Sequence, residues 1–546
     1  MSDTPITPAV ISAEAVLAAE HLIGLALTAA ERAQMLDSLN KRLPAYEQLR
    51  QLDLPNAVAP ALAFSPQRSA VAQTLTYSQR AASLSSPQTM PTRPASLEEV
   101  AFWPVTALSQ LISTRQVSAL ELTQMYLARL KRHNPALECV VTLTEELALQ
   151  QAQRADDELA RGETRGPLHG IPWGAKDLLA VQGYPTTWGA EPYQDQHFAE
   201  NATVVERLEA AGAVLVAKLS MGALAYGDVW HGGFTRNPWN LEQGSSGSSA
   251  GSASAVAAGL VGFAIGTETM GSIISPAARC GITGLRPTFG RVSRHGAMAL
   301  CWSMDKIGPM TRSVEDCALI FAAIHGPDGK EPGVVDRPFA WPAPAELRGL
   351  RIGYVKSIFD HEREHKAHDD ATLAVMRDLG AELIALELPD YPQDALWLIL
   401  WAEAAAAFDE LTLSNRDDLL KRQDNEAWPN IFRAARFIPA VEYIQANRAR
   451  TVAMQAMERV METVDVYLQP NVWGKELALT NWTGHPVVVL PNGFSADGLP
   501  STSMIFTGKL DGEAATLAVA KAYQQATDFH LRRPPLFNRE YTEFSN

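Results

Sequence analysis

One segment in the middle of the chain joins a helical pattern to a strand pattern across a single glycine. Residues Val204 to Ala211 read as a helix, and Val214-Leu-Val-Ala-Lys218 reads as a buried strand, with Gly212 between them. A strand pattern and a helix pattern also follow each other late in the chain, where the strand-like run Pro486-Val-Val-Val-Leu490 precedes a helix around residues 514–526. Alternating helices and buried strands are typical of a layered sheet covered by helices, so the predicted fold class is α/β.

The chain divides into four parts where its composition changes. Residues 1–95 are predicted to be a helical extension with a linker, and residues 96–326 the core that carries the chemistry. Residues 327–465 are Ala-rich and helical and look like an insertion, and residues 466–546 return to the core. The chain has 546 residues, which is long enough to bury a large core without disulfides or metals.

The N-terminal extension has clear helix signals. Thr28-Ala-Ala-Glu31 is a capping box, and apolar residues follow it at helical spacing. Pro44 is expected to kink or end this helix, and the Ser- and Pro-rich stretch Ser83 to Ser96 reads as a linker. We interpret the extension as a packing or dimerisation element.

The insertion is rich in aromatic residues, which predict either an apolar substrate channel or an ordinary helical core. These residues are Trp397, Trp401, Trp428, Phe432, Phe437 and Tyr443.

Charge and cysteine content exclude several classes of protein. With 46 basic and 61 acidic residues the net charge is −15, which does not suit a nucleic-acid partner. The four cysteines, Cys139, Cys280, Cys301 and Cys317, contain no C-x-x-C pair, as in proteins of a reducing compartment. The longest apolar stretch near the start is too short to span a bilayer, and no secretory basic region precedes it. We therefore expect a cytoplasmic protein without a membrane partner.

Two short motifs suggest chemistry that their surroundings do not favour. His361-Glu-Arg-Glu-His365 matches the H-E-x-x-H zinc pattern, but its surroundings are almost wholly charged and His368 has the wrong spacing for a third ligand. Gly247-Ser-Ser249-Ala-Gly251 matches the nucleophile elbow G-x-S-x-G, but the residues before it do not read as a strand. We interpret the first as a solvated surface segment, and we keep Ser249 as an alternative nucleophile.

Several further motifs occur in a fixed order. They are Gly166-Pro-Leu-His-Gly-Ile-Pro-Trp-Gly-Ala-Lys176-Asp177, Gly247-Ser-Ser-Ala-Gly-Ser252, Gly266-Thr-Glu-Thr-Met-Gly-Ser272, Pro276-Ala-Ala-Arg-Cys-Gly-Ile-Thr-Gly284-Leu-Arg-Pro-Thr-Phe-Gly290-Arg-Val-Ser293 and Asp305-Lys-Ile-Gly-Pro309. Together they resemble the amidase signature family over roughly residues 100 to 535. The resemblance implies that family's fold, a mixed twisted sheet covered by helices on both faces.

The resemblance also implies a Ser–Ser–Lys catalytic triad. The family's two serines stand 24 positions apart, as Ser248 and Ser272 do here. Ser272 is then the nucleophile, Ser248 the proton relay and Lys176 the general base. This chemistry requires a neutral lysine, which burial can provide. The turn Thr269-Met-Gly271 would supply backbone N–H groups to an oxyanion hole.

The chain departs from the family pattern close to Ser272. Glu268 stands where the family usually has Asp, Met270 where it has Gly, and Ile274 where Arg is common. Ala250 also replaces a Gly in the Ser-rich stretch. Because a side chain restricts positive φ, we expect Met270 to have the largest effect on the turn.

The predicted function is metal-independent hydrolysis of an amide C–N bond through an acyl-enzyme on Ser272. The resemblance implies no metal and no organic cofactor. The expected partner is a small amide, with a preference for hydrophobic or aryl amides, and a homodimer is plausible. Three alternatives stay open: ester or carbamate hydrolysis, a catalytically silent scaffold, and the ammonia-releasing subunit of an amidotransferase.

Overall fold

A computed structural model of the chain describes residues 10–53, 62, 90–341, 347, 349–472 and 474–537. The chain forms two compact units. Unit 1 comprises Met1–Ser65, Ala299–Ser303 and Pro389–Glu458, and unit 2 comprises Pro66–Met298, Met304–Leu388 and Arg459–Asn546. Unit 1 therefore combines the N-terminal segment with the middle of the predicted insertion. The division into four parts at residues 95, 326 and 465 stays a prediction.

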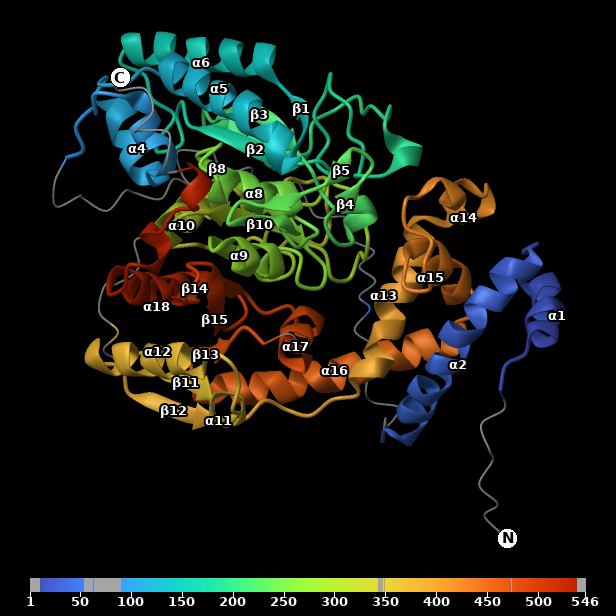
Figure 1. Cartoon of the computed structure of the whole chain (residues 1–546). Helices are drawn as coiled ribbons and strands as arrows, with labels where there is room; N and C mark the ends of the chain where they lie inside the picture. The colour runs from blue at the N-terminus through green and yellow to red at the C-terminus, as the bar shows by residue number, and fades with distance from the viewer. Residues whose placement is uncertain are drawn as a thin grey trace. The chain divides into compact units, whose positions relative to one another are not determined.

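An eleven-stranded sheet lies at the centre of unit 2 (Figure 1). In spatial order its strands are β1 (Val140–Leu143), β3 (Val214–Leu219), β2 (Pro172–Lys176), β8 (Phe263–Glu268), β10 (Lys306–Thr311), β9 (Thr283–Arg286), β14 (Val487–Phe494), β15 (Pro500–Gly508), β13 (Val466–Pro470), β11 (Ile352–Val355) and β12 (Leu383–Leu386). β2 is parallel to both β3 and β8, whereas β10 is antiparallel to β8. The sheet is mixed, as predicted.

Two layers of helices cover this sheet. Helices α8 (Ala250–Ala257) and α9 (Ile274–Cys280) contact each other and strands β8, β9 and β14. Helices α10 (Val314–Ile324) and α18 (Glu513–Gln525) contact each other and strands β9, β10, β14 and β15. The other α-helices that lie wholly within the described residues of unit 2 are α4 (Val105–Ser113), α5 (Ala119–Leu137), α6 (Glu145–Ala160), α7 (Thr203–Ala210), α11 (Lys356–Asp360), α12 (Lys366–Asp378) and α17 (Lys475–Thr483). The predicted α/β fold with helices on both faces is confirmed.

Short elements complete unit 2. Two strand pairs lie outside the central sheet: β4 (Val229–Trp230) with β5 (Gly233–Phe234), and β6 (Arg236–Asn237) with β7 (Asn240–Gly244). The 3-10 turns of this unit are η1 (Leu97–Phe102), η2 (Glu191–Tyr193), η3 (Ala223–Ala225), η5 (Phe529–Leu531) and η6 (Pro535–Phe537).

The segments that suggested the fold class have the structures expected of them. The predicted helix of residues 204–211 is α7, and the predicted strand after Gly212 is β3, in which all six residues are buried. The late strand and helix are β14 and α18. The length and apolar composition of the segment after Gly212 were sufficient to predict a strand, because every side chain of β3 is enclosed by the sheet and its helices.

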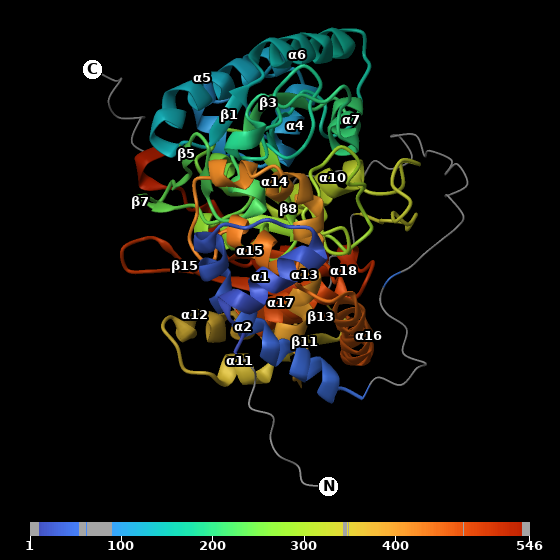
Figure 2. The same ribbon diagram turned by 90° about the vertical axis from the view of Figure 1, so that its right-hand side faces the viewer.

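Unit 1 is helical (Figure 2). It contains α1 (Ala13–Ile23), α2 (Ala29–Gln51), α13 (Gln393–Ala407), α14 (Asp409–Leu413), η4 (Arg416–Leu419), α15 (Trp428–Ala435) and most of α16 (Ala440–Thr463). Helix α2 packs against α13 and α15, and Met35, Leu39 and Ala434 form a small buried core with Val16. The N-terminal helices therefore pack on helices of the insertion.

The capping box at Thr28 is present, since Thr28 Oγ1 accepts from the Glu31 N–H and Glu31 Oε2 accepts from the Thr28 N–H. Of the two outcomes expected at Pro44, the end of the helix is not found, because α2 continues through it to Gln51, and the kink stays a prediction. Buried Leu39 and Leu49 lie on either side of Pro44, and their packing offsets the missing backbone hydrogen bond. The first half of the predicted linker, residues 83–89, lies outside the described residues.

Aromatic residues of the insertion pack within unit 1. The rings of Trp428 and Phe432 stack at 5.0 Å, and Phe432 also stacks on Phe408 at 5.4 Å. Trp428 and Phe432 are buried, as expected for a helical core. Trp397 and Trp401 stack on each other and are half-buried.

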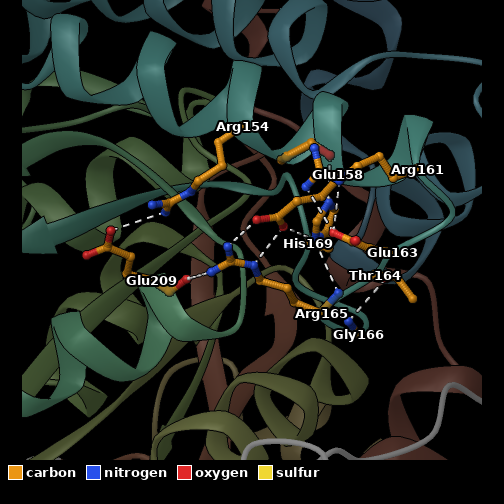
Figure 3. Close-up of polar contacts among 10 residues, drawn as sticks. Arg154, Glu158, Arg161, Glu163, Thr164, Arg165, Gly166, His169 and Glu209 are labelled. Carbon is orange, nitrogen blue, oxygen red and sulfur yellow. Dashed lines mark hydrogen bonds and ion pairs between the residues drawn. The ribbon is translucent and has the colours of Figure 1, made fainter.

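A polar cluster fixes the segment that leads from α6 to β2 (Figure 3). Arg165 Nε donates to Glu158 Oε2 at 2.7 Å, and a second bond joins the same two side chains. The Arg165 backbone N–H donates to His169 Nδ1, and His169 Nε2 lies 2.9 Å from the carbonyl oxygen of Ala155 in α6. The start of β2, and with it the position of Lys176, is tied to α6 through these contacts.

Candidate active site

Parallel strands bring the predicted site together at one edge of the sheet. Lys176 is the last residue of β2, and Glu268 is the last residue of the neighbouring strand β8. Because β2 and β8 are parallel, with Ala175 opposite Ile265, their carboxyl ends meet at this edge. The turn to Ser272 and helix α9 follows β8 directly, as at the ligand-binding edge of other parallel sheets.

Lys176 is fully buried and makes hydrogen bonds to three hydroxyl groups. Its Nζ lies 2.8 Å from Ser248 Oγ, 2.8 Å from Thr267 Oγ1 and 3.1 Å from Ser249 Oγ. Burial lowers the pKa of Lys176 to about 7, although the carboxylates of Asp305 and Glu268 act in the opposite direction. A substantial fraction of this lysine is therefore neutral at physiological pH and able to accept a proton.

Ser249 holds Lys176 in place. Its Oγ donates to the carbonyl oxygen of Thr267 at 3.1 Å and accepts from the Thr267 N–H at 3.1 Å, in addition to its contact with Lys176. The side chain has no exposed surface. The expectation that no strand precedes Ser249 needs correction, since β7 ends at Gly244, but β7 pairs only with β6 and not with the central sheet.

Two glycines permit the close packing around these serines. A Cβ atom at Gly247 would lie 1.8 Å from the carbonyl oxygen of Gly227, and one at Gly266 would lie 2.9 Å from Ser249 Oγ. Gly247 lies directly before Ser248 and Gly266 directly before Thr267, so two of the three hydroxyl partners of Lys176 follow a residue without a side chain.

The backbone of Ser272 contacts the group of side chains around Lys176. Its carbonyl oxygen accepts from the Ser249 N–H at 3.2 Å, and its side chain is 8% exposed. Within the described residues, Ser272 Oγ has no hydrogen bond, and none joins it to Ser248. The structure thus brings Lys176 and Ser248 into contact and places Ser272 beside them.

The turn before Ser272 presents unused donors. Among the described residues, the backbone N–H groups of residues 269–272 donate to no partner. Gly271 has φ of +90°, whereas Met270 lies outside the left-handed region, so the expected restriction at Met270 does not arise. Thr269 Oγ1 donates to Asp305 Oδ1 at 2.5 Å and holds the start of the turn.

Glu268 anchors the other end of the turn, a role that the sequence did not reveal. Its Oε2 accepts from the N–H groups of Ile273 and Ile274 at 2.9 and 3.0 Å. Its Oε1 accepts from Arg286 at 2.7 Å and from Asn481 at 2.9 Å. Burial works against the charge of Glu268, but Arg286 and Lys306 outweigh it, and the pKa of Glu268 is lowered.

The H-E-x-x-H segment is not helical. Residues His361 to His365 lie between α11 and α12 and are largely exposed, so the two histidines do not share a helix face. In the described part of the chain, no group of three His, Cys, Asp or Glu residues is placed to hold a metal ion.

The cysteines are all unpaired and buried. Of the helices that the structure describes, none has the length and apolar character needed to cross a bilayer.

Comparison with known proteins identifies the family. The Amidase family model matches residues 121–476, and the chain belongs to this family. The A subunit of glutamyl-tRNA(Gln) amidotransferase from Methylococcus capsulatus is 37% identical over 476 residues, which cover 78% of this chain and 96% of that protein. The protein of the same name from Chloroflexus aggregans is 35% identical over 80% of this chain and 99% of its own length.

A solved structure agrees with this assignment. The native peptide amidase of Stenotrophomonas maltophilia matches with a TM-score of 0.72 and 29% identity, over 81% of this chain and 100% of that one. The family and these relatives show that the protein is an enzyme of the amide C–N hydrolase class.

Proposed function

We propose that the protein hydrolyses carboxylic amides through an acyl-enzyme on Ser272. The observation that carries the proposal is the 2.8 Å contact between Lys176 Nζ and Ser248 Oγ in a fully buried setting. A lysine with a pKa of about 7 can act as a base for a serine, which is otherwise a weak nucleophile.

In the proposed reaction, Ser272 Oγ attacks the amide carbonyl carbon. Ser248 takes the Ser272 proton and passes its own proton to Lys176. The backbone N–H groups of residues 269–272 stabilise the negative oxygen of the tetrahedral intermediate, at about 3–4 kcal/mol for each donor. The proton then returns through Ser248 to the leaving nitrogen, which departs as amine or ammonia. Water, activated by the same pair, releases the carboxylate.

A purified-enzyme assay tests this proposal. The full chain is offered a primary amide, a peptide carboxamide, an aryl amide, an ester and a carbamate, and released amine, ammonia or alcohol is measured. We expect turnover that falls by at least about 10³-fold in Ser272→Ala and in Lys176→Ala. Ser254→Ala is the matched control, since Ser254 is a buried α8 serine bonded to the carbonyl oxygen of Arg236. Equal activity in all variants would contradict the proposal.

A second candidate is the ammonia-releasing component of an amidotransferase. It is favoured by the relatives that are named as the A subunit of glutamyl-tRNA(Gln) amidotransferase. In that case glutamine would be hydrolysed well only in the presence of a partner protein. Efficient turnover of other amides by the isolated chain would argue for the first candidate, and no turnover of any amide would favour a silent scaffold.

The finer points of location, assembly and specificity are also proposals. A cytoplasmic location is supported by four cysteines without disulfide spacing. A preference for hydrophobic or aryl amides is tested by comparing the aryl amide with the primary amide in the panel above. A homodimer formed through unit 1 is tested by the mass of the particle in solution.

A further inference from the structure

A cavity lies at the end of the sheet opposite the candidate active site. It has a volume of about 240 Å³, and its lining includes Arg312, His530, Arg532 and Arg533. Lys306 at the start of β10 is opposite Glu268, and Met310 is opposite Ala264 near the start of β8. Arg312 directly follows β10, so it lies a strand's length from Glu268 and the turn to Ser272.

Two short helices connect the two places. Helix α8 follows Ser249, and its last residue, Ala257, lines the cavity. Helix α9 follows Ser272 and Ile273, and its last residue, Cys280, lines the cavity as well. An eight-residue helix spans about 12 Å, so one small molecule cannot occupy both places.

The charged side chains among the described lining residues of this cavity are arginines. Three guanidinium groups line it, and among the described residues of its lining there is no Asp or Glu. A cavity that concentrates positive charge in low-dielectric walls attracts small anions. Arginine is the residue best suited to bind a carboxylate or phosphate, because its planar group donates two parallel hydrogen bonds.

Arg312 is built into the wall. Its side chain is 8% exposed, and its two Nη atoms donate to carbonyl oxygens, among them those of Val256 and Gly262. Its Nε is buried and has no hydrogen-bond partner among the described residues, and the same is true of His530 Nδ1. Both atoms belong to residues that line the cavity, so each can pair with a molecule bound there.

The other arginines are held in position by aromatic rings. The Arg532 guanidinium lies 4.7 Å from the centre of the Phe494 ring, and that of Arg533 lies 4.9 Å from the centre of Phe102. Arg532 has no carboxylate partner in the described part of the chain. A guanidinium stacked on a ring loses little additional freedom when it binds an anion.

The remaining wall is apolar. Trp239 and Ile282 are 8% and 4% exposed, and Trp239 Nε1 donates to the carbonyl oxygen of Cys280, which fixes its ring. The cavity thus combines a cationic part with a rigid apolar part. It is slightly smaller than the usual range for ligand pockets, which favours a compact ligand.

We propose that this cavity binds a small organic anion, a carboxylate or a phosphate monoester with a compact apolar body. Arg532 holds the acid group, Arg312 adds its positive charge and its unpaired Nε, and the ring of Trp239 contacts the body. The proposal does not depend on the roles of Ser272 or Lys176, and it adds a binding site to the enzyme apart from its active site.

Isothermal titration calorimetry on the full chain tests it, with benzoate, phenyl phosphate and inorganic phosphate as probes and benzamide as the neutral control. The Arg532→Gln variant removes one cation and exposes no new cavity. Arg377→Gln is the matched control, because Arg377 is an exposed residue of α12 far along the chain from this cavity. The variants are made in the Ser272→Ala background, so that no acyl-enzyme forms during titration.

We expect saturable binding of benzoate or phenyl phosphate, weakened about tenfold or more by Arg532→Gln and unchanged by Arg377→Gln. The stronger of the two probes tells whether the acid group is a carboxylate or a phosphate. Equal affinity in Arg532→Gln, or equal affinity for benzamide, would overturn the proposal. Inorganic phosphate binding as tightly as phenyl phosphate would overturn the role of Trp239.

Discussion

Arg286 Nη1 donates to Glu268 Oε1 at 2.7 Å, and neither side chain has any exposed surface. This pair lies beside two positions, 268 and 274, at which the chain departs from the family pattern. Position 274, where the family commonly has Arg, is Ile here, and the cation that faces Glu268 comes from Arg286 in β9. Glu268 also binds the N–H groups of Ile273 and Ile274, so the same carboxylate fixes the turn that carries Ser272.

Replacing Glu268 by Gln leaves the Arg286 guanidinium buried without a counter-charge. Breaking a buried ion pair from one side typically costs about 3–5 kcal/mol, and we expect a loss of that size in the free energy of unfolding. Urea denaturation followed by circular dichroism measures it. In the double variant Glu268→Gln/Arg286→Met we expect much of the loss to be recovered, and a double variant as unstable as the sum of both singles would contradict the coupling.

The pH dependence of activity should follow Lys176. Since the neutral lysine is the proposed base, kcat/KM should rise with pH through about 7 and then level off. The carboxylate of Asp305 raises the pKa of Lys176, so Asp305→Asn should move the rise to lower pH. Initial rates across pH 5 to 9 test both statements, and a profile that does not move in Asp305→Asn would argue against Lys176 as the titrating group.

Lys176 should also affect how the free energy of unfolding depends on pH. Its pKa is about 7 in the folded chain and near 10.5 when unfolded, so between these values the unfolded chain binds more protons. The stability of the wild type should therefore increase with pH across this window, by up to about 1.4 kcal/mol per pH unit from this group. Lys176→Met lacks this contribution. The free energy of unfolding of the wild type minus that of the variant should therefore increase from pH 7.5 to 9.5. A constant difference would show that Lys176 is charged in the folded chain.

The turn before Ser272, which we propose as the oxyanion hole, should tolerate change at Met270 better than at Gly271. Gly271 has φ of +90°, where a Cβ atom is strained, while Met270 has ordinary backbone geometry. We expect Gly271→Ala to lower kcat by about 10²-fold or more, with a smaller change in KM, because the N–H groups move relative to the developing charge. Met270→Ala, the control on the neighbouring residue, should keep kcat within a few-fold. The reverse order would contradict this account of the turn.

Much of the fold could be predicted from local sequence pattern. The strand after Gly212 and the capping box at Thr28 depend only on residues close together in the chain, and both are present. Pro44 shows the limit of such rules, because the packing of α2 against α13 and α15 keeps the helix continuous. That packing joins helices that are far apart in the sequence, which no local pattern contains.

The site was only partly visible in the sequence. Motif order indicated Lys176, Ser248 and Ser272, whose roles stay predictions. The sequence did not predict the supporting contacts of Thr267, Ser249 and Glu268. These contacts depend on strands β2 and β8 lying side by side. The Glu in place of the family's Asp was the available signal, and its contact with Arg286 became visible only in the sheet, where β9 lies two strands from β8.

The most direct test of the account identifies the reactive serine. The full chain is labelled with a fluorophosphonate, digested, and the modified peptide is located by mass spectrometry, with Ser272→Ala, Lys176→Ala and Ser249→Ala labelled in parallel. We predict modification of Ser272, lost in Ser272→Ala, slowed strongly in Lys176→Ala and retained in Ser249→Ala. Modification of Ser249 in the wild type would contradict the account and assign the nucleophile to the G-x-S-x-G motif.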